Sequence, residues 1–368
     1  MTAKELKDKN TSNVARAYYI KGKYKEARLK FEKWLAKYPT DRNSWLDYGA
    51  TLYVLGYPTL GYDATKKALE LDPSFGMAMS NIGLYHQMHN DAPKAMKWFG
   101  EAAANGYPEA NFNYSLAKLA RLMDGVVLGE AWVDDVEWTD AWLAYGYRFK
   151  KASPVRLPFV LPSCDVWGKE DEPVMIIGEQ GIGDNVMFSR YFSMLPTGSV
   201  FAVPADQHCL FPNIECITMT NSRDDIRYYS PAGSLPLYFS AAESRLDVAR
   251  SSGSGIGVCW KGNAEHSNDR NRSYPNLRSD MLRLGRSLVY GDGFKPADWV
   301  ETIEVIEELD VIITVDTSLA HVAGRMGKRV MILQPRYDWD FRWGTQRKNI
   351  WYPTVESYAT WEELLKNI

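Results

Sequence analysis

The sequence predicts a fold in two parts, an array of helical repeats followed by an α/β region of two lobes. Three observations predict it. Residues recur at a 34-residue period in the first third of the chain, short apolar runs alternate with helical patterns from Pro173 onward, and a Ser/Gly-rich joint at 251–255 divides this second part. The 368 residues are enough for two or three domains.

Bulk composition excludes several classes of protein. Hydrophobic residues make up 45% of the chain and charged residues 24%, as in ordinary globular proteins, and the net charge of −3 argues against a broad nucleic-acid or membrane-binding surface. No apolar run is long enough to span a bilayer, and the charged N-terminus lacks the apolar core of a secretory signal. We therefore expect a cytoplasmic protein with no membrane span and no nucleic-acid partner.

Four cysteines, Cys164, Cys209, Cys216 and Cys259, show no CxxC spacing, and no other cluster with metal-ligand spacing stands out. Cys209 and Cys216 could pair with each other. Reduced thiols and no bound metal are the expectation for a chain without an export signal.

The 34-residue period relates small, aromatic and proline positions in the first part of the chain. Aligning the repeats superimposes Pro39 on Pro73, Gly49 on Gly83, and the sets Ala27/Gly61/Ala95 and Phe31/Thr65/Phe99. This pattern resembles the tetratricopeptide repeat (TPR), in which small residues let two antiparallel helices approach and proline ends the second helix. We predict three repeats over residues 8–108 and a further first helix over 109–123, which gives a repeat domain at 1–123.

Residues 124–172 are predicted to connect the two parts. The stretch 124–140 is acidic, with no Lys or Arg, and is interpreted as a solvated helix face or, alternatively, an acidic binding patch. An aromatic helix follows at 142–149, and the segment 153–162 reads as an extended, proline-punctuated linker.

Strands and helices alternate in the second part. The first lobe, 173–250, has predicted strands at 174–177, 199–203 and 216–219 and a helix at 186–195. The second lobe, 251–368, has predicted strands at 256–260, 311–315 and 330–333 and helices at 299–309 and 318–326. Such alternation indicates parallel sheets, whose ligands bind at the carboxyl ends of the strands.

The first predicted strand runs into a glycine-rich turn that contains Gly181, Gly183 and Asp184. The turn lacks the third glycine of a dinucleotide-binding fingerprint. Asp184 stands where a helix begins, so it is either an N-cap or a general base at the mouth of a cleft.

A second motif, residues 316–321, joins a strand to a helix. Thr317 or Ser318 can cap that helix, and its first N–H groups, up to Leu319, would face the cleft and favour a pyrophosphate. His321 follows Thr317 by four residues, so it is predicted to share that face, and Asp316 precedes it.

A long polar loop follows the first strand of the second lobe. Lys261, Asn263, His266, Arg270 and Arg272 lie in it, near a predicted strand end. Arginine offers a planar fork for phosphate and lysine a point charge. The alternative is a solvated loop without a ligand.

Together these motifs, GEQGIGDNVMFSRY, GVCWKGNAEHSNDRNRS and DVIITVDTSLAHVAGRMGKRVMILQPRYDWDFRW, resemble the TPR-containing glycosyltransferases related to bacterial heptosyltransferases. The chain is more distantly similar to the TPR-linked O-GlcNAc transferases. The resemblance implies a two-lobed GT-B fold and an inverting, metal-independent transfer from a nucleotide-diphosphate sugar to a hydroxyl of a glycan or protein, with no cofactor.

The resemblance also implies roles for individual residues. It makes Asp184 the acceptor-activating base and assigns residues 316–321 to the diphosphate. Lys261 and the loop after it would contact the donor, and Glu301 falls near the acidic position used toward the nucleoside, although a solvated helix face explains Glu301 nearly as well. The remaining expected cleft residues are Gly181, Gly183, His266, Arg272 and Arg342.

The first lobe is short, at 78 residues, which leaves other interpretations open. One is a catalytically inactive TPR scaffold. Another is a nucleotide-binding module that does not turn over. In either case the repeats could contact another protein.

Overall fold

The structure is a computed structural model of the chain, and it describes residues 3–131, 133–150, 157, 165–219, 223, 225–266, 268–337 and 339–368. The chain forms two compact units, Met1–Lys118 and Leu119–Ile368. Apart from Leu157, the linker predicted at 153–162 lies outside the described residues, as do Cys164 and Ser267.

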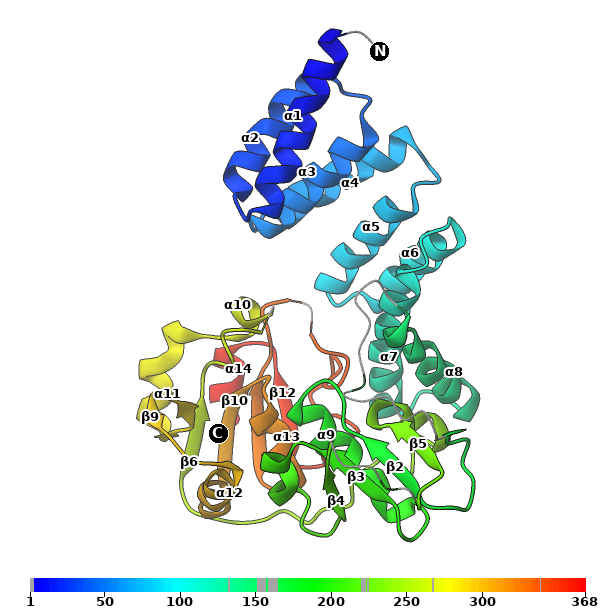
Figure 1. The fold of residues 1–368 in the computed structure, drawn as a ribbon. Helices are drawn as coiled ribbons and strands as arrows, with labels where there is room; N and C mark the ends of the chain where they lie inside the picture. The colour runs from blue at the N-terminus through cyan, green and yellow to red at the C-terminus, as the bar shows by residue number, and fades with distance from the viewer. Residues whose placement is uncertain are drawn as a thin grey trace. The chain divides into compact units, whose positions relative to one another are not determined.

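Unit 1 consists of antiparallel helical hairpins, and this confirms the helical array predicted from the 34-residue period (Figure 1). The three hairpins are α1 (Ala3–Ile20) with α2 (Tyr24–Lys37), α3 (Arg42–Val54) with α4 (Pro58–Leu71), and α5 (Gly76–Met88) with α6 (Ala92–Ala104). Helix α7 (Ala110–Leu128) follows where the next first helix is predicted. Helices α2 and α4 end two residues before Pro39 and Pro73, as expected of a residue that cannot continue a helix.

The repeated small residues bring paired helices together. A Cβ added at Gly49 would lie 2.5 Å from Thr65 Oγ1 and 2.9 Å from the carbonyl oxygen of Gly61, so α3 and α4 touch backbone to backbone. Phe31 and Phe99, from equivalent positions of α2 and α6, are fully buried. Packing of the helices therefore explains why these positions repeat.

The predicted aromatic helix is present as α8 (Asp135–Tyr145), capped by Asp134 and extended by a 3₁₀ turn, Gly146–Phe149. The acidic residues of the stretch 124–140 divide into two groups. Asp134, Asp135 and Asp140 are exposed, as expected of a solvated face. Asp124 departs from this interpretation, because its carboxylate accepts hydrogen bonds from the backbone N–H (2.6 Å) and hydroxyl (2.5 Å) of Thr345.

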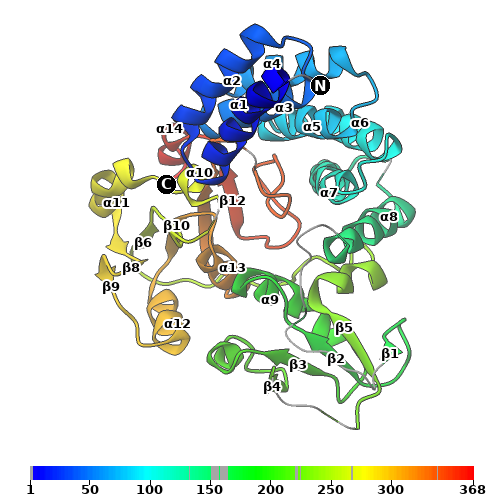
Figure 2. The same ribbon diagram turned by 45° about the horizontal axis from the view of Figure 1, so that its top comes forward.

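The first parallel sheet has the order β1-β5-β2-β3-β4, and Figure 2 gives a second view of it. Its strands are β1 (Asp165–Val166), β2 (Val174–Ile177), β3 (Val200–Val203), β4 (Cys216–Thr218) and β5 (Tyr228–Pro231). The predicted helix at 186–195 begins earlier, as α9 (Ile182–Phe188), and continues as a 3₁₀ helix, Ser189–Met194. Two more 3₁₀ segments are Ala205–Leu210 and Ala232–Tyr238. Strands β2, β3 and β4 confirm the prediction, whereas β1 and β5 were missed.

The second parallel sheet has the order β12-β11-β10-β6-β7. Its strands are β6 (Ile256–Cys259), β7 (Arg286–Ser287), β10 (Val311–Val315), β11 (Arg329–Leu333) and β12 (Val355–Tyr358). The other elements are α10 (Asp269–Arg272), the 3₁₀ turn Pro275–Leu277, α11 (Arg278–Leu284), the short strands β8 (Val289–Tyr290) and β9 (Gly293–Phe294), α12 (Trp299–Glu308), α13 (Ser318–Arg325) and α14 (Trp361–Leu365). The alternating pattern correctly predicted β6, β10, β11, α12 and α13.

The two sheets meet where the glycine-rich turn touches helix α13. Helices α9 and α13 lie side by side in both ribbon views (Figures 1 and 2). A Cβ added at Gly183 would lie 2.6 Å from His321 Cδ2, so only glycine fits against this ring. The segments that follow β2 and β10 are thereby brought together. Within the part of the chain that the structure covers, no helix combines the length and apolar character needed to cross a membrane. Cys209, Cys216 and Cys259 are free thiols.

Candidate functional site

A cavity of about 700 Å³ opens at the carboxyl ends of β6 and β10. It is lined by residues from the polar loop, from the segment leading into α12 and from the start of α13. These are Asp206, Cys259, Lys261, Gly262, Asn263, Ala264, Asp269, Leu288, Val289, Tyr290, Phe294, Pro296, Ala297, Asp298, Trp299, Thr302, Thr317, Ser318 and Leu319. The position is the one expected for a ligand site between parallel strands and the helices that follow them.

One wall of this cavity carries the anion-binding features that the sequence suggested. The Lys261 ammonium is exposed and has no hydrogen-bonding partner among the residues that the structure describes. Helix α13 starts at the same wall, and its N-cap Thr317 makes no side-chain hydrogen bond to the helix. The backbone N–H groups of Ser318 and Leu319 therefore remain available as donors, at the end of the helix where the dipole favours an anion.

Another part of the wall is apolar and was not anticipated from the sequence. Leu288, Val289, Tyr290 and Phe294 come from the short β8–β9 region, and Trp299 opens α12. These residues lie in a stretch whose strands are too short to leave a periodic pattern. An aromatic base can be held by such side chains.

Three carboxylates also line the cavity, and two of them have structural partners. Asp298 caps α12 by accepting the Glu301 N–H, and Asp269 accepts a hydrogen bond of 2.7 Å from the Ser273 hydroxyl. Asp206 comes from the segment after β3, and no partner for its side chain is found among the described residues. It is the contribution of the first sheet's segments to this wall, and sequence reasoning missed it.

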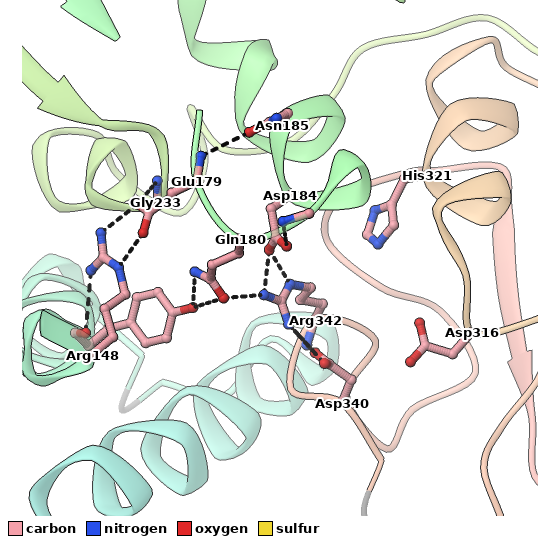
Figure 3. A network of polar contacts seen from close by, with 12 residues as sticks. Arg148, Glu179, Gln180, Asp184, Asn185, Gly233, Asp316, His321, Asp340 and Arg342 are labelled. Carbon is pink, nitrogen blue, oxygen red and sulfur yellow. Dashed lines mark hydrogen bonds and ion pairs between the residues drawn. The ribbon is translucent and has the colours of Figure 1, made fainter. Parts of the chain in front are cut away.

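The predicted base Asp184 lies outside the lining of this cavity and is engaged in an ion pair (Figure 3). Its Oδ1 accepts from Arg342 Nε at 2.8 Å and also from Arg342 Nη2. Arg342 Nη1 in turn lies 2.9 and 2.8 Å from the two carboxylate oxygens of Asp340. Both Asp184 and Arg342 side chains are 13% exposed, so the pair is largely shielded from water.

Asp184 is not the N-cap of helix α9, which was one of the two roles considered for it. Gly181 is the N-cap of α9, and Asp184 sits three residues later, in the first turn. Its Oδ2 accepts the Gly181 N–H at 3.3 Å, as the third helical residue of a capping box does. Burial raises the pKa of the Asp184 carboxyl above its ordinary value, and the positive charge of Arg342 opposes that rise.

His321 and Asp316 lie beside this ion pair and away from the wall of the cavity. The His321 imidazole stacks near Trp343, with ring centroids 4.5 Å apart, and its Nδ1 lies 3.1 Å from the Tyr352 hydroxyl. Burial lowers the pKa of His321 well below its ordinary value, so the ring is neutral and brings no charge to a phosphate. Asp316 accepts a hydrogen bond of 2.8 Å from the Trp343 indole, and burial, with a contribution from Asp340, raises its pKa to about 6.

Two other residues predicted for the donor site, Glu301 and Arg272, instead make hydrogen bonds to backbone groups of nearby loops. Glu301 lies in the first turn of α12, where its carboxylate accepts the Ala297 N–H at 2.8 Å, and it does not line the cavity. Arg272 is 9% exposed and donates to the carbonyl oxygen of Asp316 at 2.9 Å, which ties the polar loop to the start of α13.

Two further residues of the polar loop are exposed. The His266 Nδ1 accepts the Asn268 N–H at 3.2 Å. Arg270 contributes its carbonyl oxygen to Arg336, and its own side chain is not part of the cavity wall. Of the loop side chains predicted to contact the donor or line the cleft, Lys261 and Asn263 line the cavity, and His266, Arg270 and Arg272 do not.

A buried ion pair behind the glycine-rich turn was also missed. Arg148 and Glu179 have side chains 1% and 0% exposed, and two guanidinium nitrogens of Arg148 lie 2.9 and 2.7 Å from the Glu179 oxygens (Figure 3). Glu179 also accepts the Gly233 N–H, and Arg148 donates to the Ser234 hydroxyl. Gln180, next in the chain, is linked to the Tyr145 hydroxyl at 2.8 Å. In the sequence, this pair could have been suspected only from the presence of one acidic residue in GEQG and one arginine in the predicted aromatic helix.

No group of three or more His, Cys, Asp or Glu side chains in the described parts of the chain is arranged to hold a metal ion.

Comparison with known proteins yields similarity to solved structures. No protein-family model matches the chain, and no curated protein matches it. A mutant of the Thermobaculum terrenum O-GlcNAc transferase aligns with 90% of this chain and 51% of its own, at 13% identity and a TM-score of 0.36, so the chain spans about half the length of that protein.

The helical array is similar to TPR proteins of known structure. The Yersinia enterocolitica type III secretion chaperone SycD, in complex with a peptide of the translocator YopD, aligns with 33% of this chain and 97% of its own, at 16% identity and a TM-score of 0.30. The first TPR domain of Spaghetti, bound to an HSP90 peptide, aligns with 27% and 80%, at 18% identity and a TM-score of 0.27. Unit 1 itself is an array of paired helices that follow the 34-residue period of the sequence.

Proposed function

We propose that unit 2 binds a nucleotide-diphosphate sugar in the 700 Å³ cavity and transfers the sugar to a hydroxyl acceptor. One observation carries the proposal: Lys261 and the open N-terminus of α13 share a cavity with an apolar wall. The volume is within the range of cavities that hold small molecules, about 300–1,000 Å³.

The two kinds of wall suit the two ends of such a donor. A diphosphate beside Ser318 and Leu319 would receive backbone N–H hydrogen bonds and the favourable end of the helix dipole, and Lys261 would supply a full positive charge. The nucleoside would pack on Tyr290 and Phe294. The departing diphosphate gains negative charge as the glycosidic bond breaks, so these donors would stabilise the transition state more than the bound substrate.

The reaction that we propose is a direct displacement at the anomeric carbon. Asp184 takes the proton of the acceptor hydroxyl, whose oxygen forms the new bond to that carbon. The bond to the diphosphate oxygen breaks, and the diphosphate leaves with the electron pair. Raising the pKa of a carboxyl by burial brings it closer to the operating pH and suits it to this role.

For Asp184 to act, its carboxylate has to be presented to the acceptor. Its Oδ2 is held only by the long hydrogen bond from Gly181 among the described residues, whereas Oδ1 is held by Arg342. Arg342 has Asp340 as a second partner, which would retain it if Asp184 were released.

We also propose that unit 1 contacts another protein. Tyr62, Lys66, Ile82 and Trp98 line a hollow of about 190 Å³ on the repeats, which would suit a side chain of a protein acceptor or another protein partner. This contact is a proposal separate from donor binding.

A thermal-shift screen of nucleoside diphosphates and nucleotide sugars tests the proposal, because a ligand that binds only the folded state raises the melting temperature. Ser318→Pro removes one N–H donor at a helix position that tolerates proline, and Ser318→Ala keeps that donor as a matched control. We expect the proline variant, and not the alanine variant, to lose the shift produced by the diphosphate. Equal shifts in both variants, with folding preserved, would refute the donor site.

A second candidate is a nucleotide-binding module without turnover. It is favoured by the pairing of Asp184 with Arg342 and by the absence of Asp184 from the cavity lining. This candidate predicts diphosphate binding but no release of sugar or free diphosphate from any nucleotide sugar tested. Release that depends on Asp184 would exclude it.

A further inference from the structure

A second cavity, of about 530 Å³, lies where the C-terminus of α13 meets the segment that follows α9. It is lined by residues 189–190, 192–193, 195–199 and 213–215, by Leu246 and by Arg325. It shares no lining residue with the 700 Å³ cavity. Nothing in the proposed transfer reaction uses it.

Two arginines line this cavity, and neither forms an ion pair with a carboxylate in the described part of the chain. Arg325 is partly buried, and no acceptor for its guanidinium is found in the described part of the chain. Arg190 is 7% exposed and donates from Nη1 to the carbonyl oxygens of Trp351 at 2.6 Å and Ser244 at 3.0 Å, and it also lies over the Trp351 and Tyr352 rings. These partners are neutral, and no carboxylate among the described residues pairs with Arg190.

The carboxylate at this cavity does not compensate the charges either. Glu215, the acidic side chain among the described lining residues, is 2.6 Å from Arg223 and is committed to it. Burial lowers the pKa of Arg325, and the charge of Arg190 lowers it further, while Tyr352 acts in the opposite direction. In the absence of a ligand the like charges therefore oppose folding, and an anion between them would remove that cost.

The rim of the cavity is polar. Ser193, Thr197 and Asn213 are exposed there, and they offer hydroxyl and amide groups beside the guanidinium of Arg325. Arginine binds phosphate through two parallel hydrogen bonds, and hydroxyl and amide groups suit the hydroxyls of a sugar. The cavity is several times larger than a phosphate ion requires, since a water molecule occupies only about 30 Å³ of liquid.

We propose that this second cavity binds a small phosphorylated, hydroxyl-rich molecule such as a sugar phosphate. Arg325 holds the phosphate directly, Arg190 supplies a fixed positive field, and the rim holds the hydroxyl-bearing part. Because α13 also provides the first cavity's anion site at its other end, a ligand here would bear on the helix that the proposed donor uses.

Titration calorimetry with glucose 6-phosphate and, in parallel, with inorganic phosphate tests this site. The titrations use the full chain carrying Lys261→Gln, which removes the charge proposed to hold phosphate at the first cavity. In this background Arg325→Gln is compared with Arg283→Gln, which removes the same charge from an exposed arginine on α11. We expect Arg325→Gln to weaken glucose 6-phosphate binding by about tenfold or more and Arg283→Gln to leave it unchanged.

The two probes separate a phosphate site from a sugar-phosphate site. Tighter binding of glucose 6-phosphate than of inorganic phosphate is the expected result. Equal affinities would overturn the assignment of the rim to a sugar. Equal binding by Arg325→Gln and Arg283→Gln, or no binding of glucose 6-phosphate by the Lys261→Gln parent, would overturn the site.

The melting temperature in phosphate-free buffer distinguishes a ligand-binding arginine from a structural one, because the two roles predict opposite effects of Arg325→Gln. Removing an uncompensated charge should leave the melting temperature of Arg325→Gln equal to or above that of its parent. If Arg325 served only to favour the C-terminus of α13, the substitution would lower the melting temperature instead. Should the glutamine variant fail to fold, Arg325→Lys keeps the charge but loses the planar fork, and unchanged binding by this variant would contradict the proposal.

Discussion

Arg342 holds the carboxylate of Asp184 by a single oxygen, with Nε at 2.8 Å and Nη2 on the same Oδ1 (Figure 3). Asp184 belongs to the glycine-rich turn after β2, and Arg342 to the segment between β11 and β12. The ion pair therefore fastens the two sheets' loops to each other at the position proposed for the chemistry. For Asp184 to act as a base, it must accept a proton on Oδ2 or release Arg342 from Oδ1.

The first prediction concerns Asp184→Asn. Asparagine can still accept the Gly181 N–H but carries no charge for Arg342, which keeps Asp340. We expect unfolding free energy to fall by about 1–3 kcal/mol, as for the loss of a charged hydrogen bond. Sugar transfer should fall by about 10²–10⁴-fold, the contribution of a general base, while diphosphate binding stays close to wild type.

Chemical denaturation, a transfer assay and a thermal shift with diphosphate measure these three quantities on the same variant. Reduced stability together with unchanged transfer would leave Asp184 as a purely structural residue.

The second prediction concerns pH and Asp316. A carboxyl whose pKa is raised to about 6 in the folded protein, from about 3.8, is easier to ionise in the unfolded chain. Ionisation of Asp316 therefore opposes folding. The stability that the protonated carboxyl contributes at low pH is lost as the pH rises from about 4 to 6. Asp316→Asn keeps an oxygen for the Trp343 indole and cannot ionise.

The difference in unfolding free energy between Asp316→Asn and wild type should consequently grow in favour of the variant across that pH range and become constant above about pH 7. Denaturation at a series of pH values measures it. A difference that does not change with pH would show that Asp316 has an ordinary pKa.

The third prediction concerns the buried pair Arg148–Glu179. Arg148→Met leaves a buried carboxylate with the Gly233 N–H but no cation, and this should cost about 3–5 kcal/mol of stability. Adding Glu179→Gln removes the unpaired charge, so the double variant should be more stable than Arg148→Met alone. A double-mutant cycle from denaturation midpoints gives the coupling, and strictly additive effects would contradict it.

The fourth prediction uses two helical glycines of unit 1. Gly49→Ala would place its Cβ 2.5 Å from Thr65 Oγ1 and 2.9 Å from a backbone oxygen, so α3 and α4 must separate. Gly100→Ala would meet nothing nearer than 3.8 Å, in Tyr114, and should gain up to about 1 kcal/mol from the better helix propensity of alanine. Thermal unfolding followed by circular dichroism should thus shift in opposite directions, and a shift of the same sign in both would be inconsistent with the helix contact.

Much of the fold was predictable because its signals are local. The repeat period, the prolines after α2 and α4, and the apolar runs of β2, β6 and β10 are properties of neighbouring residues. Strands β1, β7, β8 and β9 are two residues long and β5 reads YYSP, so periodicity had nothing to detect there. Strands β1, β5 and β7 are placed by pairing with strands distant in the sequence, whereas β8 and β9 pair only with each other.

At the site, local sequence patterns identified which segments end strands and begin helices, and so which residues could approach a ligand. Among the residues predicted in this way, Lys261, Asn263 and 317–319 line the larger cavity. Only the folded chain shows that His321 is buried and neutral, that Arg342 forms an ion pair with Asp184, and that Asp206 reaches the cavity. The reason is that charge pairing and burial depend on side chains more than 100 residues apart, as Asp184 and Arg342 are, and only the packed sheets bring these together.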